Sequence, residues 1–259
     1  MENWLDLNQR RVAITGGGSG IGLAVTRAFL GAGARVEIID RNPSTQDVAA
    51  SLDAGPARGR VRAHLADVRD RTSMQRVADS IARDGGGVDI LVPNAGVNVR
   101  AALLDLTDAD IDTIVSTNLV GVIVTMQVFV PLMKGSDAAS IVVTSSAIAE
   151  HGMVLRSVYA ATKAGVSGLV RSAALEWGPT GIRVNAVAPG VIATPLTQAY
   201  MDQFPERADA ARTGVPLGRI GTPEDVADVV LALAGRPSRF ITGQTVYVDG
   251  GLTAGTTWW

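Results

Sequence analysis

Tyr159 and Lys163 are a pair of residues whose types and spacing suit acid/base chemistry. Periodicity predicts a helix from Ser157 to Trp177, and residues four apart lie on one helix face, one turn from each other. A free phenol has a pKa of about 10, too high for a general base at neutral pH. A neighbouring ammonium favours the phenolate, so we expect Lys163 to lower the pKa of Tyr159 toward the working range of a catalytic acid or base.

Ser146 is a third candidate, because it follows a continuously apolar run that predicts a buried strand at Ser140–Ser145. Its hydroxyl is expected at the carboxyl edge of a sheet, where open α/β folds bind ligands. There it can donate a hydrogen bond to a carbonyl or alkoxide oxygen as charge develops. The alternative interpretation is an ordinary surface helix pair at Tyr159 and Lys163 and a simple strand-end hydroxyl at Ser146.

A glycine-rich segment has the composition of a nucleotide-phosphate site. Residues 15–22 read Thr-Gly-Gly-Gly-Ser-Gly-Ile-Gly and lie between a predicted strand, Arg11–Thr15, and a helical pattern from Leu23. Glycines let the backbone approach phosphates, and a helix N-terminus supplies free N–H groups and partial positive charge. The glycines fit G-x-x-x-G-x-G rather than the strict G-x-G-x-x-G pattern, so a flexible turn is the alternative interpretation.

Asp40 closes the next predicted strand, Ala34–Asp40, and stands 18 residues after Gly22. A spacing of about 20 residues is typical of the carboxylate that binds the adenosine ribose hydroxyls. Such a carboxylate repels a 2′-phosphate, which predicts NAD rather than NADP. Arg41 is a contrary signal, since a guanidinium can pair with that phosphate, and a plain turn residue is the alternative for Asp40.

The elements that must position these residues alternate between short β-branched runs and longer helical patterns. We expect strands at Arg11–Thr15, Ala34–Asp40, Val61–Asp67, Val88–Asn94, Ser140–Ser145, Ile182–Ala188 and Gln244–Val248. Further helices are expected after Thr107, where Thr107 and Asp110 have capping-box spacing, and from Thr222. This alternation predicts one Rossmann-type α/β domain over residues 1–259, with a doubly wound, seven-stranded parallel sheet and helices on both faces.

Composition favours a packed chain and excludes several function classes. Of 259 residues, 47% are hydrophobic and 19% are charged. The net charge of −2 does not indicate the basic surface that binding to nucleic acid or to an anionic membrane requires. The absence of cysteine excludes disulfides and thiolate chemistry, and the two histidines lack metal-ligand spacing. The polar residues 1–11 and the polar interruptions of Ile111–Met133 predict a cytoplasmic protein without a membrane span.

Together the motifs resemble those of the classical short-chain dehydrogenase/reductase family, in the same order and spacing, over nearly the whole chain. The matching motifs are Thr15–Gly22, Asn94-Ala95-Gly96, Asn118, Ser146, Tyr159-x-x-x-Lys163 and Pro189-Gly190. Each motif is weak alone, but their joint occurrence is specific. The resemblance implies an oxidoreductase whose nicotinamide cofactor carries the hydride.

The resemblance also implies roles for individual residues. Tyr159 exchanges the proton and Ser146 orients the substrate oxygen. Lys163 holds the nicotinamide ribose, and Asn118 links the site to water through a proton relay. The implied cofactor contacts are Gly16, Gly18, Ser19, Gly20, Ile21, Gly22, Asp40, Asp67, Val68, Asn94, Ala95, Gly96, Tyr159, Lys163, Pro189, Gly190, Ile192 and Thr194.

The expected reaction is the NAD-dependent interconversion of a secondary alcohol and a ketone. A segment at about 193–215, expected to contain two short helices, is assigned to substrate binding. A C-terminus that resembles polyol and sugar-alcohol dehydrogenases favours a small polyol or hydroxyketone. A carrier-linked 3-oxoacyl reductase, which normally prefers NADPH, and a non-catalytic NAD-binding redox sensor are the alternatives.

Two further features concern assembly and the pocket. The apolar stretches Ile114–Val130 and Val166–Leu175 are expected to be too hydrophobic for one sheet face, and the resemblance implies a homotetramer. His151, beside Glu150, either contacts a polar substrate or faces solvent. The tail Trp258-Trp259 either covers a neighbouring subunit's pocket or packs at an interface.

Overall fold

The computed structural model describes residues 4–204, 209 and 211–255. Within these residues seven strands form one parallel sheet in the order β3-β2-β1-β4-β5-β6-β7. The strands are β1 (Arg11–Thr15), β2 (Arg35–Asp40), β3 (Val61–Leu65), β4 (Ile90–Pro93), β5 (Ser140–Thr144), β6 (Arg183–Pro189) and β7 (Thr245–Val248). The direction in which successive strands are added reverses between β1 and β4, so the boundary between these two strands is the switch point of a doubly wound sheet. This topology confirms the predicted Rossmann-type fold.

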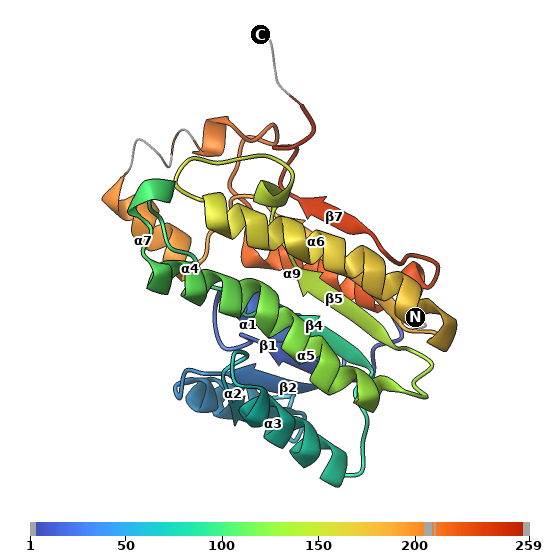
Figure 1. The fold of residues 1–259 in the computed structure, drawn as a ribbon. Helices are drawn as coiled ribbons and strands as arrows, with labels where there is room; N and C mark the ends of the chain where they lie inside the picture. The colour runs from blue at the N-terminus through green and yellow to red at the C-terminus, as the bar shows by residue number, and fades with distance from the viewer. Residues whose placement is uncertain (1–3, 205–208, 210, 256–259) are drawn as a thin grey trace.

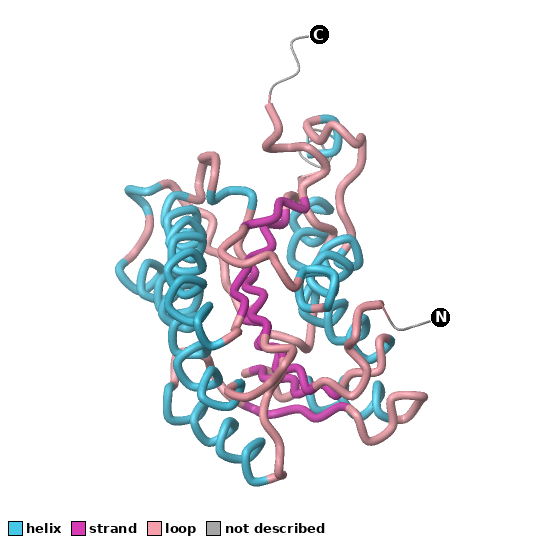
Figure 2. Tube along the Cα trace, turned by 90° about the vertical axis from the view of Figure 1, so that its right-hand side faces the viewer, coloured by secondary structure: helices cyan, strands magenta, loops and turns pink. Residues whose placement is uncertain are grey.

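Helices cover both faces of the sheet (Figures 1 and 2). They are α1 (Gly20–Gly31), α2 (Thr45–Asp53), α3 (Arg71–Arg83), α4 (Asp108–Val115), α5 (Gly121–Phe129), α6 (Ser157–Trp177), α7 (Pro195–Gln203) and α9 (Pro223–Ala234). Short 3₁₀ turns lie at Leu103–Asp105, Val130–Met133, Ala147–Ala149, Gly178–Thr180 and Arg236–Ser238. Helices α3, α5 and α6 lie on one face, and α1 and α9 pack together on the other.

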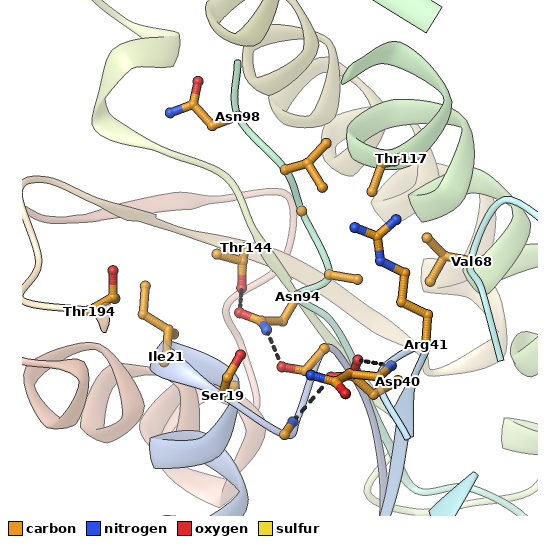
Figure 3. Close-up of a pocket in the computed structure, with 18 of the residues that line it drawn as sticks. Ser19, Ile21, Asp40, Arg41, Val68, Asn94, Asn98, Thr117, Thr144 and Thr194 are labelled. Atoms are coloured by element: carbon orange, nitrogen blue, oxygen red, sulfur yellow. Dashed lines mark hydrogen bonds between the residues drawn. The ribbon is translucent and has the colours of Figure 1, made fainter. Parts of the chain in front are cut away.

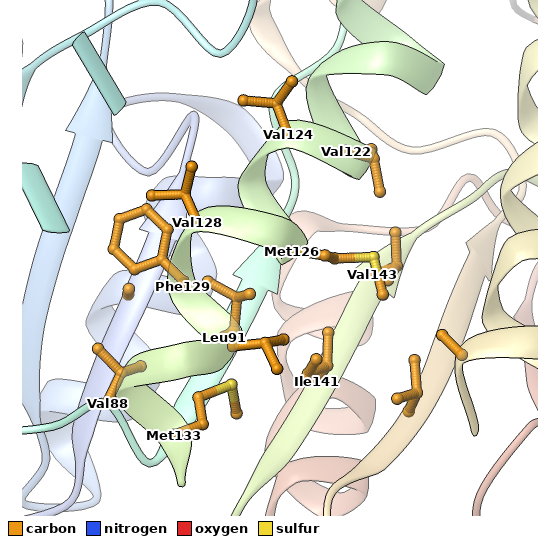
Figure 4. Packing of buried hydrophobic residues seen from close by; sticks show 14 of the residues in the cluster. Val88, Leu91, Val122, Val124, Met126, Val128, Phe129, Met133, Ile141 and Val143 are labelled. Atoms are coloured by element: carbon orange, nitrogen blue, oxygen red, sulfur yellow. The ribbon is translucent and has the colours of Figure 1, made fainter. Parts of the chain in front are cut away.

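Each face of the sheet has its own hydrophobic core. On the α5 side, Phe129 and Met126 pack against Leu91, Ile141 and Val143 of the central strands (Figure 4). All residues of β4 and β5 are buried, as expected for strands covered on both faces. Burial of this apolar area fixes the register of the central strands and therefore the positions of their carboxyl ends.

The helix predicted after Thr107 begins with the expected capping box between Thr107 and Asp110. It does not continue regularly, because residues Ser116–Val120 form a π-helical turn between α4 and α5. The stretch Asp108–Met133 is long and apolar enough to cross a membrane by composition, but 61% of its apolar window is buried inside the chain. It is therefore a core helix of this fold.

The same burial corrects the expectation about excess apolar surface. Most hydrophobic residues of the stretch Ile114–Val130 are buried in the chain's own core, because α5 faces the sheet between β4 and β5. The expectation that this stretch is too hydrophobic for one sheet face is therefore wrong for most of it. Val120 on the π turn and Leu175 on α6 remain exposed, at 44% and 80%.

Several strands end earlier than predicted, and this matters for the site. Asp67, Asn94 and Ser145 were expected to close strands, but each lies just beyond the last paired residue of β3, β4 and β5. Residues that follow the last strand residue no longer have side chains that alternate between the two faces of the sheet, so their side chains can point toward the carboxyl edge of the sheet.

Candidate functional site

A cavity of about 710 Å³ runs along the carboxyl ends of the strands, with walls from the segments that follow β1 to β6. Its size lies within the range of about 300–1,000 Å³ typical of small-molecule and cofactor sites. Nineteen residues named from the sequence line it: Gly16, Gly18, Ser19, Gly20, Ile21, Gly22, Asp40, Asp67, Val68, Asn94, Ala95, Gly96, Ser146, Tyr159, Lys163, Pro189, Gly190, Ile192 and Thr194. Asn118 is the remaining candidate, and it lies behind the wall.

The glycine-rich turn forms one side of this cavity, and its geometry requires glycine. Gly16 and Gly20 have φ angles of 67° and 50°, a region that residues with a Cβ seldom adopt. A Cβ at Gly22 would overlap the carbonyl oxygen of Gly16, and one at Gly20 would lie 3.5 Å from Thr194 Cγ2 across the cavity. The turn leads into α1, whose extended N-cap Ser19 makes no side-chain capping bond. The free N–H groups of this helix start therefore face a space that suits a phosphate.

Asp40 ends β2 at the edge of the cavity and is tied to the glycine turn (Figure 3). Its Oδ2 accepts a hydrogen bond of 3.4 Å from Gly18 N, and its Oδ1 accepts one of 3.0 Å from Asn42 N. Each carboxylate oxygen keeps further acceptor capacity toward the cavity. Arg41 also lines the cavity, with its guanidinium directed toward Thr117.

Asp67 and Val68 line the cavity beyond β3. The Asp67 carboxylate pairs with the Arg69 guanidinium at 2.7 Å, and this hydrogen bond holds the pKa of Asp67 below its ordinary value. Asp67 is therefore an anion at neutral pH. The pairing with Arg69 was not foreseen from the sequence.

Asn94 connects three strands at the centre of the cavity. Its backbone N–H donates to Thr15 Oγ1 at 3.0 Å, and its Nδ2 donates to the Gly16 carbonyl at 3.2 Å. Its Oδ1 accepts a 3.1 Å hydrogen bond from Thr144 Oγ1 (Figure 3). These bonds join the ends of β1, β4 and β5, so Asn94 holds the glycine turn in place beside Ala95.

Asn118 occupies the π turn and is fully buried. Its Oδ1 accepts from Val97 N and its Nδ2 donates to the Val97 carbonyl, both at 2.8 Å. The side-chain amide therefore holds the segment after β4 in place, and the proton relay at Asn118 stays a prediction. A π turn at this position agrees with the frequent placement of such turns at functional sites.

Helix α6 starts at Ser157 as predicted and brings Tyr159 and Lys163 to the cavity wall beside Ser146. Lys163 is 3% exposed, and its Nζ donates a 2.7 Å hydrogen bond to the Thr144 carbonyl. Burial lowers the pKa of Lys163 to about 8.

The proton affinity of Tyr159 differs from the expectation. Burial raises the pKa of Tyr159 above its ordinary value, and the opposing hydrogen bond with Ser146 and charge of Arg156 do not compensate. The expectation that Lys163 brings the pKa down is wrong for this structure. The cause is burial of the phenol, which outweighs the groups that favour the phenolate. The Lys163 ammonium lies 5.8 Å from the ring centroid and donates its hydrogen bond to the Thr144 carbonyl.

The opposite end of the cavity is built by the chain after β6. Gly190 packs so closely on β7 that a Cβ there would lie 2.8 Å from Asp249 Cα. Ile192 is buried, and the Thr194 hydroxyl shares a 3.0 Å hydrogen bond with Thr197 Oγ1. Helix α7 follows as one of the two helices expected in the segment 193–215. The second falls partly outside the described residues, although residues 211–213 are helical.

Among the residues with open roles, His151 is partly buried and its Nδ1 has no hydrogen-bond partner within the described residues. Glu150 is engaged elsewhere, because its Oε2 accepts a 3.1 Å hydrogen bond from Tyr247 Oη on β7. The tail Trp258-Trp259 lies outside the described residues.

Sequence reasoning missed several residues of the cavity: Thr144, Val97, Asn98 and Thr117. Thr144 matters through its carbonyl and hydroxyl, which bind Lys163 and Asn94. Its place at the end of the strand before Ser146 was the available signal. Asn98 had no sequence signal, because nothing in a loop residue's spacing predicts that it reaches the cavity.

The chain matches known proteins along nearly its whole length. A family model described as enoyl-(acyl carrier protein) reductase covers residues 16–253. The 3-oxoacyl-acyl-carrier-protein reductase FabG of Thermotoga maritima is 40% identical over 240 residues, covering 92% of this chain and 96% of the relative.

Solved structures of dehydrogenases also match the chain over nearly its whole length. A glucose/ribitol dehydrogenase from Brucella melitensis superposes with a TM-score of 0.88 at 31% identity, covering 95% of this chain and 97% of that one. A protein from Beutenbergia cavernae, assigned as an NAD(P)-dependent gluconate 5-dehydrogenase and carrying NADP at low occupancy, gives 0.91 at 33% identity. That match covers 97% of this chain and 100% of the neighbour.

Proposed function

The chain belongs to the classical short-chain dehydrogenase/reductase family of oxidoreductases that act on CH–OH groups, and on this premise we propose that it interconverts a secondary alcohol and a ketone with NAD. One observation carries the proposal. Tyr159, Lys163 and Ser146 line the same cavity as the glycine turn and Asp40, so the proton-transfer groups and the nucleotide cradle share one space.

The residues present fit a nicotinamide dinucleotide. Gly16, Gly18, Gly20 and Gly22 line the cavity at the start of α1, and a Cβ at Gly20 would extend toward Thr194 Cγ2 on its opposite side. Asp40 and Val68 would hold the adenosine half, while Ile192 and Thr194 would hold the nicotinamide end. When bound, the cofactor accepts or supplies the hydride.

The chain's own residues supply the proton chemistry. Tyr159, whose raised pKa keeps the phenol protonated at neutral pH, gives its proton to the substrate oxygen during reduction. During oxidation the phenol must first lose its proton to solvent, and the phenolate then takes the proton of the alcohol. Ser146 donates a hydrogen bond to the same oxygen. Lys163 is held against Thr144 and would bind the cofactor ribose.

NAD is proposed over NADP because Asp40 lines the cavity at the end of β2, where its carboxylate would accept hydrogen bonds from the ribose hydroxyls and repel a 2′-phosphate. Its carboxylate is fixed by Gly18 and Asn42 but keeps lone pairs toward the cavity. The neighbour from Beutenbergia cavernae carries NADP, and Arg41 on the wall of this cavity offers a guanidinium to a phosphate. The preference therefore depends on whether Asp40 or Arg41 dominates, and we assign it to Asp40.

A small polyol or hydroxyketone is the proposed substrate. The glucose/ribitol and gluconate names of structural neighbours support this class. The second candidate is a 3-oxoacyl reductase, which the 40% identity to the Thermotoga maritima reductase favours. A non-catalytic redox sensor is disfavoured because the chain keeps both Tyr159 and Lys163. We further propose a cytoplasmic, single-domain protein that forms a homotetramer and binds neither nucleic acid nor membranes.

The test is a screen of substrates in which turnover is measured as the increase in NADH absorbance. The purified chain is given NAD with polyols, cyclic alcohols, hydroxy acids and 3-hydroxyacyl thioesters. Turnover of polyols supports the proposal, and turnover restricted to the thioesters supports the second candidate. NADH binding without turnover on any substrate supports the sensor.

A further inference from the structure

Asn98 is one of two lining residues of the cavity, with Thr117, whose buried side-chain oxygen has no hydrogen-bond partner within the described residues; of the two, Asn98 carries a side-chain amide. Its side chain lines the cavity, yet its buried Oδ1 has no hydrogen-bond partner within the described residues. Buried acceptors in proteins are nearly always paired, so an unpaired one in a cavity wall requires a specific explanation. A ligand that brings a donor supplies one.

The Asn98 amide can turn toward such a ligand at low cost. The terminal torsion of asparagine is broad, so the amide of this cavity-lining residue can change its orientation at low cost. No hydrogen bond to Oδ1 from the described part of the chain has to break in this rotation. The unpaired state of the atom therefore favours a ligand-bound orientation.

The backbone that carries Asn98 is fixed beside the catalytic residues. Val97 exchanges two 2.8 Å hydrogen bonds with Asn118. A Cβ on Gly96 would lie 3.8 Å from Lys163 Nζ. Because each residue extends a chain by at most about 3.6 Å, Asn98 Cα lies within about 7 Å of Gly96 Cα. Asn98 also lies well away from Asp40 and Arg41 (Figure 3), which places it outside the adenosine half.

The geometry points to Asn98 as a specificity-determining residue that binds a second hydroxyl group of the substrate, on a carbon close to the one that is oxidised. The inference rests on the proposed function and narrows its substrate to diols, polyols and hydroxyketones. Oδ1 is a neutral acceptor, so it pairs with a hydroxyl donor. A thioester carbonyl, as in a 3-oxoacyl substrate, has no proton to give it.

The experiment compares matched substrates that differ by one hydroxyl. We expect wild-type kcat/KM with NAD to be about 10- to 100-fold higher for 2,3-butanediol than for 2-butanol, the range that a lost buried hydrogen bond gives. The same preference is expected for 1,2-cyclohexanediol over cyclohexanol. Asn98→Leu should remove most of it, while Asn98→Asp, which keeps the acceptor oxygen, should retain it.

Binding gives a readout that does not depend on turnover. Acetoin should bind the wild-type enzyme–NADH complex more tightly than 2-butanone, as followed by NADH fluorescence, and Asn98→Leu should abolish the difference. NADH affinity itself should stay the same in both variants, which shows that they fold.

Three outcomes overturn the inference: equal kcat/KM for the paired alcohols, loss of preference in Asn98→Asp as well as Asn98→Leu, or no preferential binding of acetoin. Failure of the proposed function looks different. It appears as absence of turnover across all the alcohols in the screen, whereas failure of this inference appears as turnover without preference for the second hydroxyl.

Discussion

At Tyr159 two opposing effects set the proton affinity of the phenol. Burial stabilises the neutral form and raises the pKa, while the Ser146 hydrogen bond and the Arg156 charge favour the phenolate. Of these effects on the pKa of Tyr159, burial is the largest. The site is therefore prepared to donate a proton at neutral pH, which is the requirement for ketone reduction.

This leads to a pH prediction whose sign follows from the raised pKa. Oxidation needs the deprotonated phenol, whose population grows as pH rises, so kcat for alcohol oxidation should increase from about pH 6 to about pH 9. Ketone reduction needs the protonated form and should not gain over the same range. Initial rates in both directions across this range check it. An oxidation rate that falls steadily with rising pH would contradict the assignment of Tyr159 as the titrating base.

Asp40 gives the second prediction at this scale. Two like charges about 4 Å apart repel by roughly 4 kcal/mol at an effective dielectric of about 20, an upper limit before solvent and Arg41 compensate. Half of that amounts to a preference of about thirtyfold for NAD. Asp40→Ala should weaken NAD and relieve the penalty on NADP, as read from kcat/KM with both cofactors. A wild type that already prefers NADP would mean that Arg41 outweighs Asp40.

At the scale of elements, the glycine turn and α1 form one unit whose tolerance for side chains varies with position. A Cβ at Gly22 would overlap the Gly16 carbonyl oxygen and lie 2.6 Å from Asn94 Nδ2. A Cβ added at Gly31, at the other end of the same helix, would have no neighbour within 4 Å among the residues that the structure describes. A Gly→Ala substitution at Gly22 therefore tests the close contact between the turn and its neighbours, whereas the same substitution at Gly31 tests only the helix propensity of alanine.

We expect Gly22→Ala to lower the free energy of unfolding and to weaken NADH binding at least about tenfold, because the displaced Asn94 holds the cavity wall. Gly31→Ala should be neutral or stabilise the fold by up to about 1 kcal/mol, since alanine favours the helix. Urea unfolding and NADH fluorescence titration of both variants provide the comparison. Equal effects of the two substitutions would contradict the role of the turn.

Elements with strong local signals were predictable from the sequence, and those set by distant contacts were not. The bounds of α6, the capping box at Thr107 and the helix start at Thr222 follow from periodicity and cap residues, and the structure has them. The π turn at Ser116–Val120 has no comparable signal. It forms around Asn118, whose amide binds the backbone of Val97, 21 residues away.

The same distinction holds for the site. The glycine turn, Asp40 and the Tyr159–Lys163 pair were found from spacing and Ser146 from its place after a predicted strand, and all line the cavity. The raised pKa of Tyr159 was not foreseen, because it depends on burial, which the spacing of Tyr159 and Lys163 does not reveal. Asn98 was missed for a related reason, since its unpaired Oδ1 is a property of packing.

At the scale of the whole molecule, the resemblance to the family predicts a tetramer with two-fold axes. The apolar face of α5 does not provide the reason, because it is used by the chain's own core. Leu175 on α6 is 80% exposed and is the better candidate for an interface residue. Light scattering at micromolar concentration should give the mass of four chains, and Leu175→Glu should shift it downward. A monomeric wild type would rule the tetramer out.

The most direct test of the account is removal of the Tyr159 hydroxyl. Tyr159→Phe keeps the ring and its packing but deletes the titrating proton, so turnover should fall by roughly 10²-fold or more while NADH still binds. Tyr247→Phe is the matched control, because Tyr247 lies on β7 and bonds Glu150 rather than lining the cavity; it should keep most of its turnover. Near-normal turnover in Tyr159→Phe, with NADH affinity intact, would contradict the assignment of Tyr159 as the catalytic acid and base.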